Sequence, residues 1–124
     1  MGSVTPFVHL VVPGNPVPKA RPRVGAHRNV YTPRRTLEAE ARLLGYLKAA
    51  YPRLRPATGP CALAVTFYLK TDRRVDVDNL TKLVMDVGNR RIWLDDSQVS
   101  DVRVQKFTRA AVPRTEISVY VEDA

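Results

Sequence analysis

The sequence is poor in cysteine and contains no long apolar run. Its one cysteine, Cys61, stands beside small apolar residues and is predicted to be buried, and a single cysteine allows no disulfide framework or cysteine-based zinc site within the chain. No stretch approaches the ~20 apolar residues that span a bilayer, and the N-terminus has no signal-peptide core. We therefore expect a soluble protein of the reducing cytoplasm with no membrane partner.

Acidic residues are nearly absent from the first half of the chain. Residues 1–60 hold ten Lys and Arg against the two acids Glu38 and Glu40, whereas residues 61–124 hold ten of each kind, so the first half accounts for the net charge of +8. The stretch from Pro13 to Thr36 has six cations and no acid. A concentrated cationic excess is typical of polyanion binders, although it can also serve only solubility.

Apolar periodicity predicts one mixed α/β (α+β) domain over residues 1–124. Alternation and β-branched runs predict strands at 7–12, 63–69, 99–107 and 117–121, the second of them central because both of its faces are apolar. Helical spacing predicts two main helices. The first begins at Thr32-Pro33 and ends before Pro52, and the second covers 79–87 with a stop at Gly88-Asn89.

The sequence also predicts which helix residues are buried and how the chain continues after the first strand. The predicted apolar face of the first helix consists of Leu37, Ala41, Leu44, Leu47 and Ala50 or Tyr51, and that of the second consists of Leu80, Leu83, Val84 and Val87. The prolines that follow the first strand remove backbone donors, so we expect an irregular basic arm at about 13–35. Its cations would then be carried on a stiffened backbone.

Carboxylates are concentrated in the second half, where seven of the twelve acids fall between residues 72 and 101. Asp76 and Asp78 lie two residues apart where strand-like sequence changes to helix, so in an extended junction both would point the same way. Lys82 follows Asp78 by one helical turn. A second pair, Asp95-Asp96, follows apolar residues 92–94, which would hold it against the fold.

Two interpretations of these carboxylates are open. Gathered at one point they would form a hard-oxygen site that selects Mg²⁺ or Mn²⁺ and supports phosphodiester hydrolysis. Alternatively, Asp78 or Asn79 caps the helix and Lys82 is an ordinary ion-pair partner on its surface. Unshielded acids would repel a polyanion, and a bound metal ion supplies a reason for them.

Two blocks resemble the signature of the RusA family of Holliday junction resolvases. The segment Asp76-Val77-Asp78-Asn79-Leu80-Thr81-Lys82 resembles D-x-D-N-x-x-K, and Trp93-Leu94-Asp95-Asp96-Ser97-Gln98-Val99 resembles the later apolar-L-D-D-x-Q block. The resemblance extends to Asp86 and more loosely to the arm at 16–23. It departs at Val75, where some relatives carry arginine, which bears on substrate preference.

This resemblance implies a homodimeric α/β enzyme that binds four-way junctions and nicks two opposed strands with Mg²⁺, for which Mn²⁺ can substitute. The implied catalytic residues are Asp76, Asp78, Lys82 and Asp96, with Asp76, Asp78 and Asp96 as metal ligands and Asp95 as a further candidate. We expect phosphate contacts from cations of the basic arm and of the loop before Asp76, namely Lys19, Arg21, Arg23, Arg28, Arg34, Arg35 and Arg74.

Two alternatives of other classes remain. One is a nucleotidyl- or glycosyltransferase that uses Asp-x-Asp to hold a Mg²⁺-nucleotide, although the chain lacks a glycine-rich phosphate loop. The other is a non-catalytic basic DNA-binding protein whose acids cap helices. For the resolvase we expect a cytoplasmic site of action, on the nucleoid or in a phage-infected bacterial cell.

Overall fold

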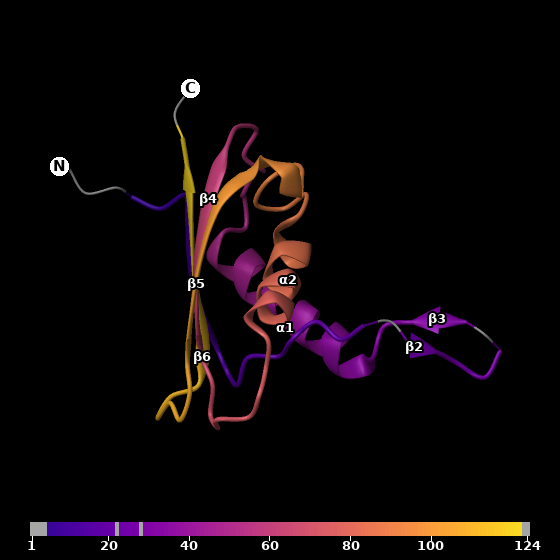
Figure 1. The fold of residues 1–124 in the computed structure, drawn as a ribbon. Coiled ribbons are helices and arrows are strands. Elements are labelled where there is room, and N and C mark those ends of the chain that lie inside the picture. The colour runs from indigo at the N-terminus through magenta and orange to yellow at the C-terminus, as the bar shows by residue number, and fades with distance from the viewer. Residues whose placement is uncertain (1–4, 22, 28, 123–124) are drawn as a thin grey trace.

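Two helices pack against one face of a mixed β-sheet (Figure 1). The structure is a computed structural model that describes residues 5–21, 23–27 and 29–122. The main elements of this part are β1 (Val8–Pro13), α1 (Arg34–Ala50), β4 (Cys61–Tyr68), α2 (Val77–Gly88), β5 (Val99–Phe107) and β6 (Arg114–Val121). The strand order is β1-β6-β4-β5, with β6 antiparallel to both neighbours and β4 parallel to β5. The predicted α+β class is confirmed.

The parallel pair β4 and β5 decides where α2 lies. Parallel neighbours cannot be joined by a tight hairpin and need a crossover of a dozen or more residues. Here the crossover consists of a loop, α2 and the segment 89–98, and it returns the chain to the sheet beside β4. Both acidic blocks lie on this one crossover. The central position predicted for β4 is also confirmed.

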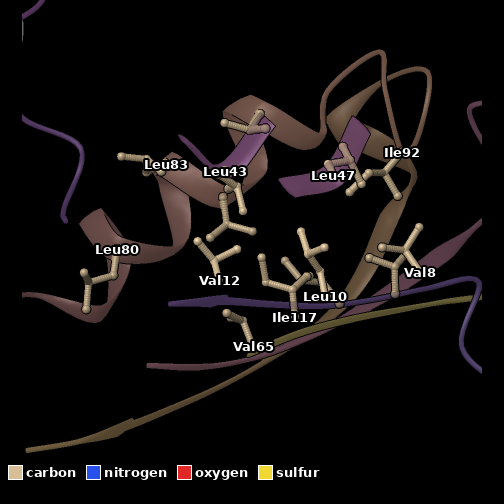
Figure 2. Packing of buried hydrophobic residues seen from close by; sticks show 14 of the residues in the cluster. Val8, Leu10, Val12, Leu43, Leu47, Val65, Leu80, Leu83, Ile92 and Ile117 are labelled. Carbon is tan, nitrogen blue, oxygen red and sulfur yellow. The ribbon is translucent and has the colours of Figure 1, made fainter. Parts of the chain in front are cut away.

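The core fills the space between the sheet and the two helices. Figure 2 shows Leu43 and Leu47 of α1 on the helix side of the core and Leu10 and Ile117 on the sheet side, and Leu83 of α2 belongs to the same buried cluster. The predicted apolar face of α2 is confirmed, because its members are all buried, namely Leu80, Leu83, Val84 and Val87. Cys61 is buried as well, as its neighbours predicted.

The predicted apolar face of α1 is wrong at Leu37 and Ala41, although Leu47 is buried as predicted. Leu37 is 52% exposed and Ala41 is exposed too, whereas Thr36 and Leu43 are buried. A buried hydroxyl is tolerated when it is hydrogen-bonded, and the Thr36 Oγ1 accepts a bond from the Ala20 backbone N–H at 3.3 Å. The helix also begins at Arg34 with Pro33 as its N-cap, one residue later than the sequence predicted.

The basic arm is more regular than its prolines predicted. Strand β2 (Arg23–Val24) pairs with β3 (Val30–Tyr31) in a short antiparallel hairpin that projects away from the main sheet (Figure 1). The Gly25 N–H donates to the Asn29 carbonyl at 2.7 Å and closes the turn. Pairing is possible because Pro13, Pro16 and Pro18 precede these strands. No helix in the described ranges is long and apolar enough to cross a membrane.

Candidate active site

The first acidic block lies at the N-terminus of α2. Asp76 is the N-cap residue with extended backbone angles, and Asp78 belongs to the first helical turn. The Asp76 carboxylate makes no capping hydrogen bond within the described chain, and Asp78 does not occupy the N-cap position. The capping interpretation therefore does not account for these side chains, which leaves their oxygens available to a ligand.

The second acidic block is fixed by a buried tryptophan. Trp93 is fully buried, and its Nε1 donates a hydrogen bond of 2.7 Å to the Asp96 Oδ1. The indole lies against the end of α2, where a Cβ at Gly88 would be 2.7 Å from the Trp93 Cη2 and 2.8 Å from its Cζ2. Only glycine gives the ring this room. The anchoring role predicted for Trp93 is confirmed, with Gly88 as its unforeseen partner.

Asp95 has a different role from Asp96. It is the N-cap of a short 3₁₀ helix, η1 (Asp96–Gln98), and its Oδ2 accepts hydrogen bonds from the backbone N–H and the hydroxyl of Ser97. These bonds hold the pKa of the Asp95 carboxyl below its ordinary value. Gln98 completes the capping box and donates its Nε2 to the Ala57 and Gly59 carbonyls. Asp95 thus shapes the loop that carries Asp96.

One shallow depression combines residues from both blocks. It measures about 450 Å³ and is lined on α2 by Asp78, Lys82 and Asp86, and on η1 by Asp96. Thr81, Met85 and two valines of β5 complete its wall. Asp78 and Asp96 are 18 residues apart in the sequence, and the crossover brings them to one hollow beside the predicted catalytic lysine.

Asp76 lines a neighbouring depression of about 230 Å³ and not the one that contains Asp96. In the extended junction that the sequence predicted, residues two apart would point the same way. The helix starts at Val77, however, and residues two apart on a helix point in widely different directions. Within the described residues no three His, Cys, Asp or Glu side chains are grouped closely enough to hold a metal ion.

The donor set still suits a hard divalent cation. Asp78 and Asp96 supply carboxylate oxygens in one depression. Among the described residues that line it there is no histidine or cysteine, and its sulfur is the Met85 thioether. Mg²⁺ commonly takes only one or two carboxylates and completes its shell with water and substrate phosphate. Two carboxylates in one depression match the number that Mg²⁺ commonly takes, and Asp76 lines a separate depression.

The predicted DNA contacts fall into distinct environments. Arg35 and Arg74 line the depression that contains Asp76. Arg73 lines it too; it was not among the predicted DNA contacts, although it adjoins Arg74 in the loop before the acidic block. Arg34 pairs with Glu38 at 3.0 Å, and Lys19 is held by two acids of the fold. Arg21 is exposed, the backbone of Arg23 lies in β2, and Arg28 lies outside the described residues.

Two comparisons relate this chain to known proteins. Residues 13–120 match the family model described as endodeoxyribonuclease RusA. The uncharacterized protein YqaN of Bacillus subtilis (strain 168) is 30% identical over 136 aligned residues, which cover 90% of this chain and 94% of YqaN. The matched residues include the arm, both acidic blocks and nearly all of β6. These findings support endonuclease chemistry on DNA over the transferase alternative.

Proposed function

Because this chain belongs to the RusA family of endodeoxyribonucleases, we propose that it resolves four-way DNA junctions and related branched DNA by paired, Mg²⁺-dependent nicking. One observation carries the proposal beyond the family. Two carboxylates and a lysine from separate segments, Asp78, Lys82 and Asp96, line one depression. The proposed cellular role is recombination and repair, with Mn²⁺ able to replace Mg²⁺.

The chain's own groups would divide the work of hydrolysis. Asp78 and Asp96 would hold the ion, and Asp76 would reach it from the adjoining surface. When bound, Mg²⁺ activates water and offsets the negative charge that develops on the phosphate. The Lys82 ammonium, which lines the same depression as both ligands, would bind the scissile phosphate and offset part of that charge. Trp93 holds Asp96 in place through its indole N–H.

Arginines beside Asp76 would hold the flanking DNA backbone. Arg35, Arg73 and Arg74 line one depression, and none of them makes an ion pair within the described chain. Free guanidinium groups next to a catalytic carboxylate suit the phosphates on either side of a cleavage point. Such contacts position the backbone and carry no sequence information. Arg21 and the hairpin would extend the same basic surface.

Paired nicking also requires two active sites, so we propose that the enzyme works as a homodimer. A four-way junction has approximate two-fold symmetry, and a two-fold dimer presents identical sites to its opposed strands. A monomer would release a singly nicked junction.

The decisive experiment incubates the protein with an end-labelled four-way junction in Mg²⁺, in Mn²⁺ and in chelator. The wild type is expected to cut opposed strands only with metal, and Asp96→Asn and Asp78→Asn are expected to bind without cutting. If the wild type cuts the junction in neither Mg²⁺ nor Mn²⁺, the proposed endonuclease activity is refuted. Because no three His, Cys, Asp or Glu side chains are grouped within the described residues, a non-catalytic DNA-binding protein is the second candidate, and binding with no cutting would support it.

A further inference from the structure

We propose that Lys19 is an internal cation that fixes the root of the basic arm to both helices and positions the wall of the catalytic depression, and that it is not a DNA contact. The part of this proposal that concerns cleavage rests on the proposed function. The part that concerns the arm and the helices does not. Lys19 lies in the acid-free segment, where the sequence alone predicted a phosphate contact.

The Lys19 ammonium is engaged by two carboxylates from different helices. Its Nζ lies 3.3 Å from the Glu40 Oε2 of α1 and 3.0 Å from the Asp86 Oδ2 of α2. The Lys19 side chain is only 19% exposed, against 91% for that of Arg34 in its surface pair with Glu38. A cation shared between two partly buried acids has little capacity left for a phosphate.

Backbone contacts fix the same segment. The Lys19 N–H donates to the Asn79 carbonyl at 2.8 Å, in the first turn of α2, and the next N–H, of Ala20, donates to the buried Thr36 hydroxyl of α1. Residues 19–20 therefore bond to both helices through main chain as well as side chain. The arm is attached at the turn of α2 that carries Asp78.

Asp86 connects this attachment to the depression. It lines the same hollow as Asp78, Lys82 and Asp96, and its Oδ2 is the atom bonded to Lys19. An aspartate neutralised in this way adds no uncompensated charge beside the metal-binding pair. We therefore assign Asp86 a positioning role and leave Asp78 and Asp96 as the metal ligands.

The ionisation of Lys19 agrees with this geometry. Partial burial lowers the pKa of the ammonium, but the hydrogen bond and charge of Asp86, with those of Glu40, outweigh it and leave the pKa above its ordinary value. No other acidic, basic or histidine side chain makes a charged contact with Lys19 in the described part of the chain. The cation is therefore fully charged at physiological pH.

Arg21 offers a matched control. It lies two residues further along the arm, is exposed, and makes no ion pair within the described residues. If the arm's cations act alike, Lys19→Met and Arg21→Met will weaken DNA binding alike. If Lys19 is internal, Lys19→Met will lower stability and kcat, whereas Arg21→Met will weaken DNA binding.

The test compares Lys19→Met, Lys19→Arg, Asp86→Asn, the Lys19→Met/Asp86→Asn double variant and Arg21→Met. Thermal unfolding is measured without DNA or metal. Junction affinity is measured in chelator at several salt concentrations. Cleavage is then measured in Mg²⁺ at saturating junction, so that kcat is separated from KM.

We expect Lys19→Met to lower the melting temperature and to reduce kcat on the order of tenfold to a hundredfold, the scale of a lost positioning contact. The salt dependence of its DNA affinity should match the wild type. Lys19→Arg should restore most of kcat, and the double variant should lose less stability than the sum of the single losses. Arg21→Met should instead weaken junction affinity and flatten its salt dependence by about one counterion, with the melting temperature close to that of the wild type.

A Lys19→Met variant that keeps kcat and stability but flattens the salt dependence would overturn the proposal. Additive stability losses for Lys19→Met and Asp86→Asn would also overturn it. If Lys19→Met does not fold, Asp86→Asn with Lys19 intact decides, because an unchanged kcat there would refute the positioning role. If the wild type does not cut DNA, the unfolding and salt measurements still test the internal contact, so the two failures are distinguishable.

Discussion

The second acidic block at 95–96 and the exposed arginines of the basic arm at 13–35 that are unpaired within the described chain differ in how firmly their charged groups are held. On the crossover, Asp96 is bonded to a buried indole and Asp95 to a capping serine. On the arm and the start of α1, Arg21 and Arg35 are exposed and make no ion pair within the described chain. Groups that meet a reacting phosphate need fixed positions, whereas groups that follow a charged backbone need only reach it.

Asp96→Asn should have the largest effect, and it tests the firmly held acids of the crossover. The amide keeps the size of the side chain and its bond to Trp93 but loses the charge that would hold Mg²⁺. We expect junction cleavage to fall on the order of a thousandfold, with junction affinity in chelator unchanged or higher. Asp95→Asn is the control, and an equal loss of cleavage in both variants would contradict the separate roles.

Gly88→Ala tests what fixes Asp96 in place. Alanine improves helix propensity by about 1 kcal/mol, but its Cβ would press on a fully buried indole, and overpacking typically costs about 1–3 kcal/mol. We expect a net loss of stability in urea unfolding and slower cleavage, because Trp93 must shift and carry Asp96 with it. Gly45→Ala, where a Cβ meets no atom within 4 Å, should stabilise the protein or leave it unchanged. Equal behaviour of the two variants would reject this packing argument.

Arg74→Ala tests an exposed arginine in the loop before Asp76, outside the arm. We expect a several-fold loss of junction affinity and a salt dependence smaller by about one counterion, with kcat nearly unchanged. Arg103→Ala is the matched control. Arg103 lies opposite Ala64 across the β4–β5 pair and so faces away from the helices, while its own partner is Asp101 at 3.6 Å. Equal losses in the two variants would show that net charge alone binds the DNA.

The smallest effect concerns pH. Because the pKa of Lys19 in the folded protein is raised above its ordinary value of 10.5, its contribution to stability is complete below pH 10.5 and is lost as pH rises through the raised value. The stability difference between wild type and Lys19→Met should therefore be constant from pH 7 to 9 and shrink above pH 10.5. Urea unfolding of both proteins across this range measures it. A difference that already vanishes at pH 8 would contradict the internal pairing.

Much of the fold was predictable because local patterns and tertiary packing agree. The strand at 99–107 has the predicted limits, and Leu80, Leu83, Val84 and Val87 are buried as their spacing requires. The face of α1 was not predictable, because Thr36 becomes buried only when the arm supplies a donor to its hydroxyl. The short β2–β3 hairpin was missed because two-residue strands have no alternation to detect.

Charge distribution and the spacing of the acidic blocks were determined by the sequence itself, and together with the family resemblance they predicted a metal-dependent nuclease. Tertiary structure decided which acids share a surface. The parallel pairing of β4 and β5 returns the chain so that Asp96 joins Asp78 and Lys82, while the start of α2 at Val77 places Asp76 in the adjoining depression. It also decided that Lys19, a cation among cations in the sequence, pairs with Glu40 and Asp86. Sequence patterns encode local periodicity and composition, whereas such pairings depend on elements that are distant along the chain.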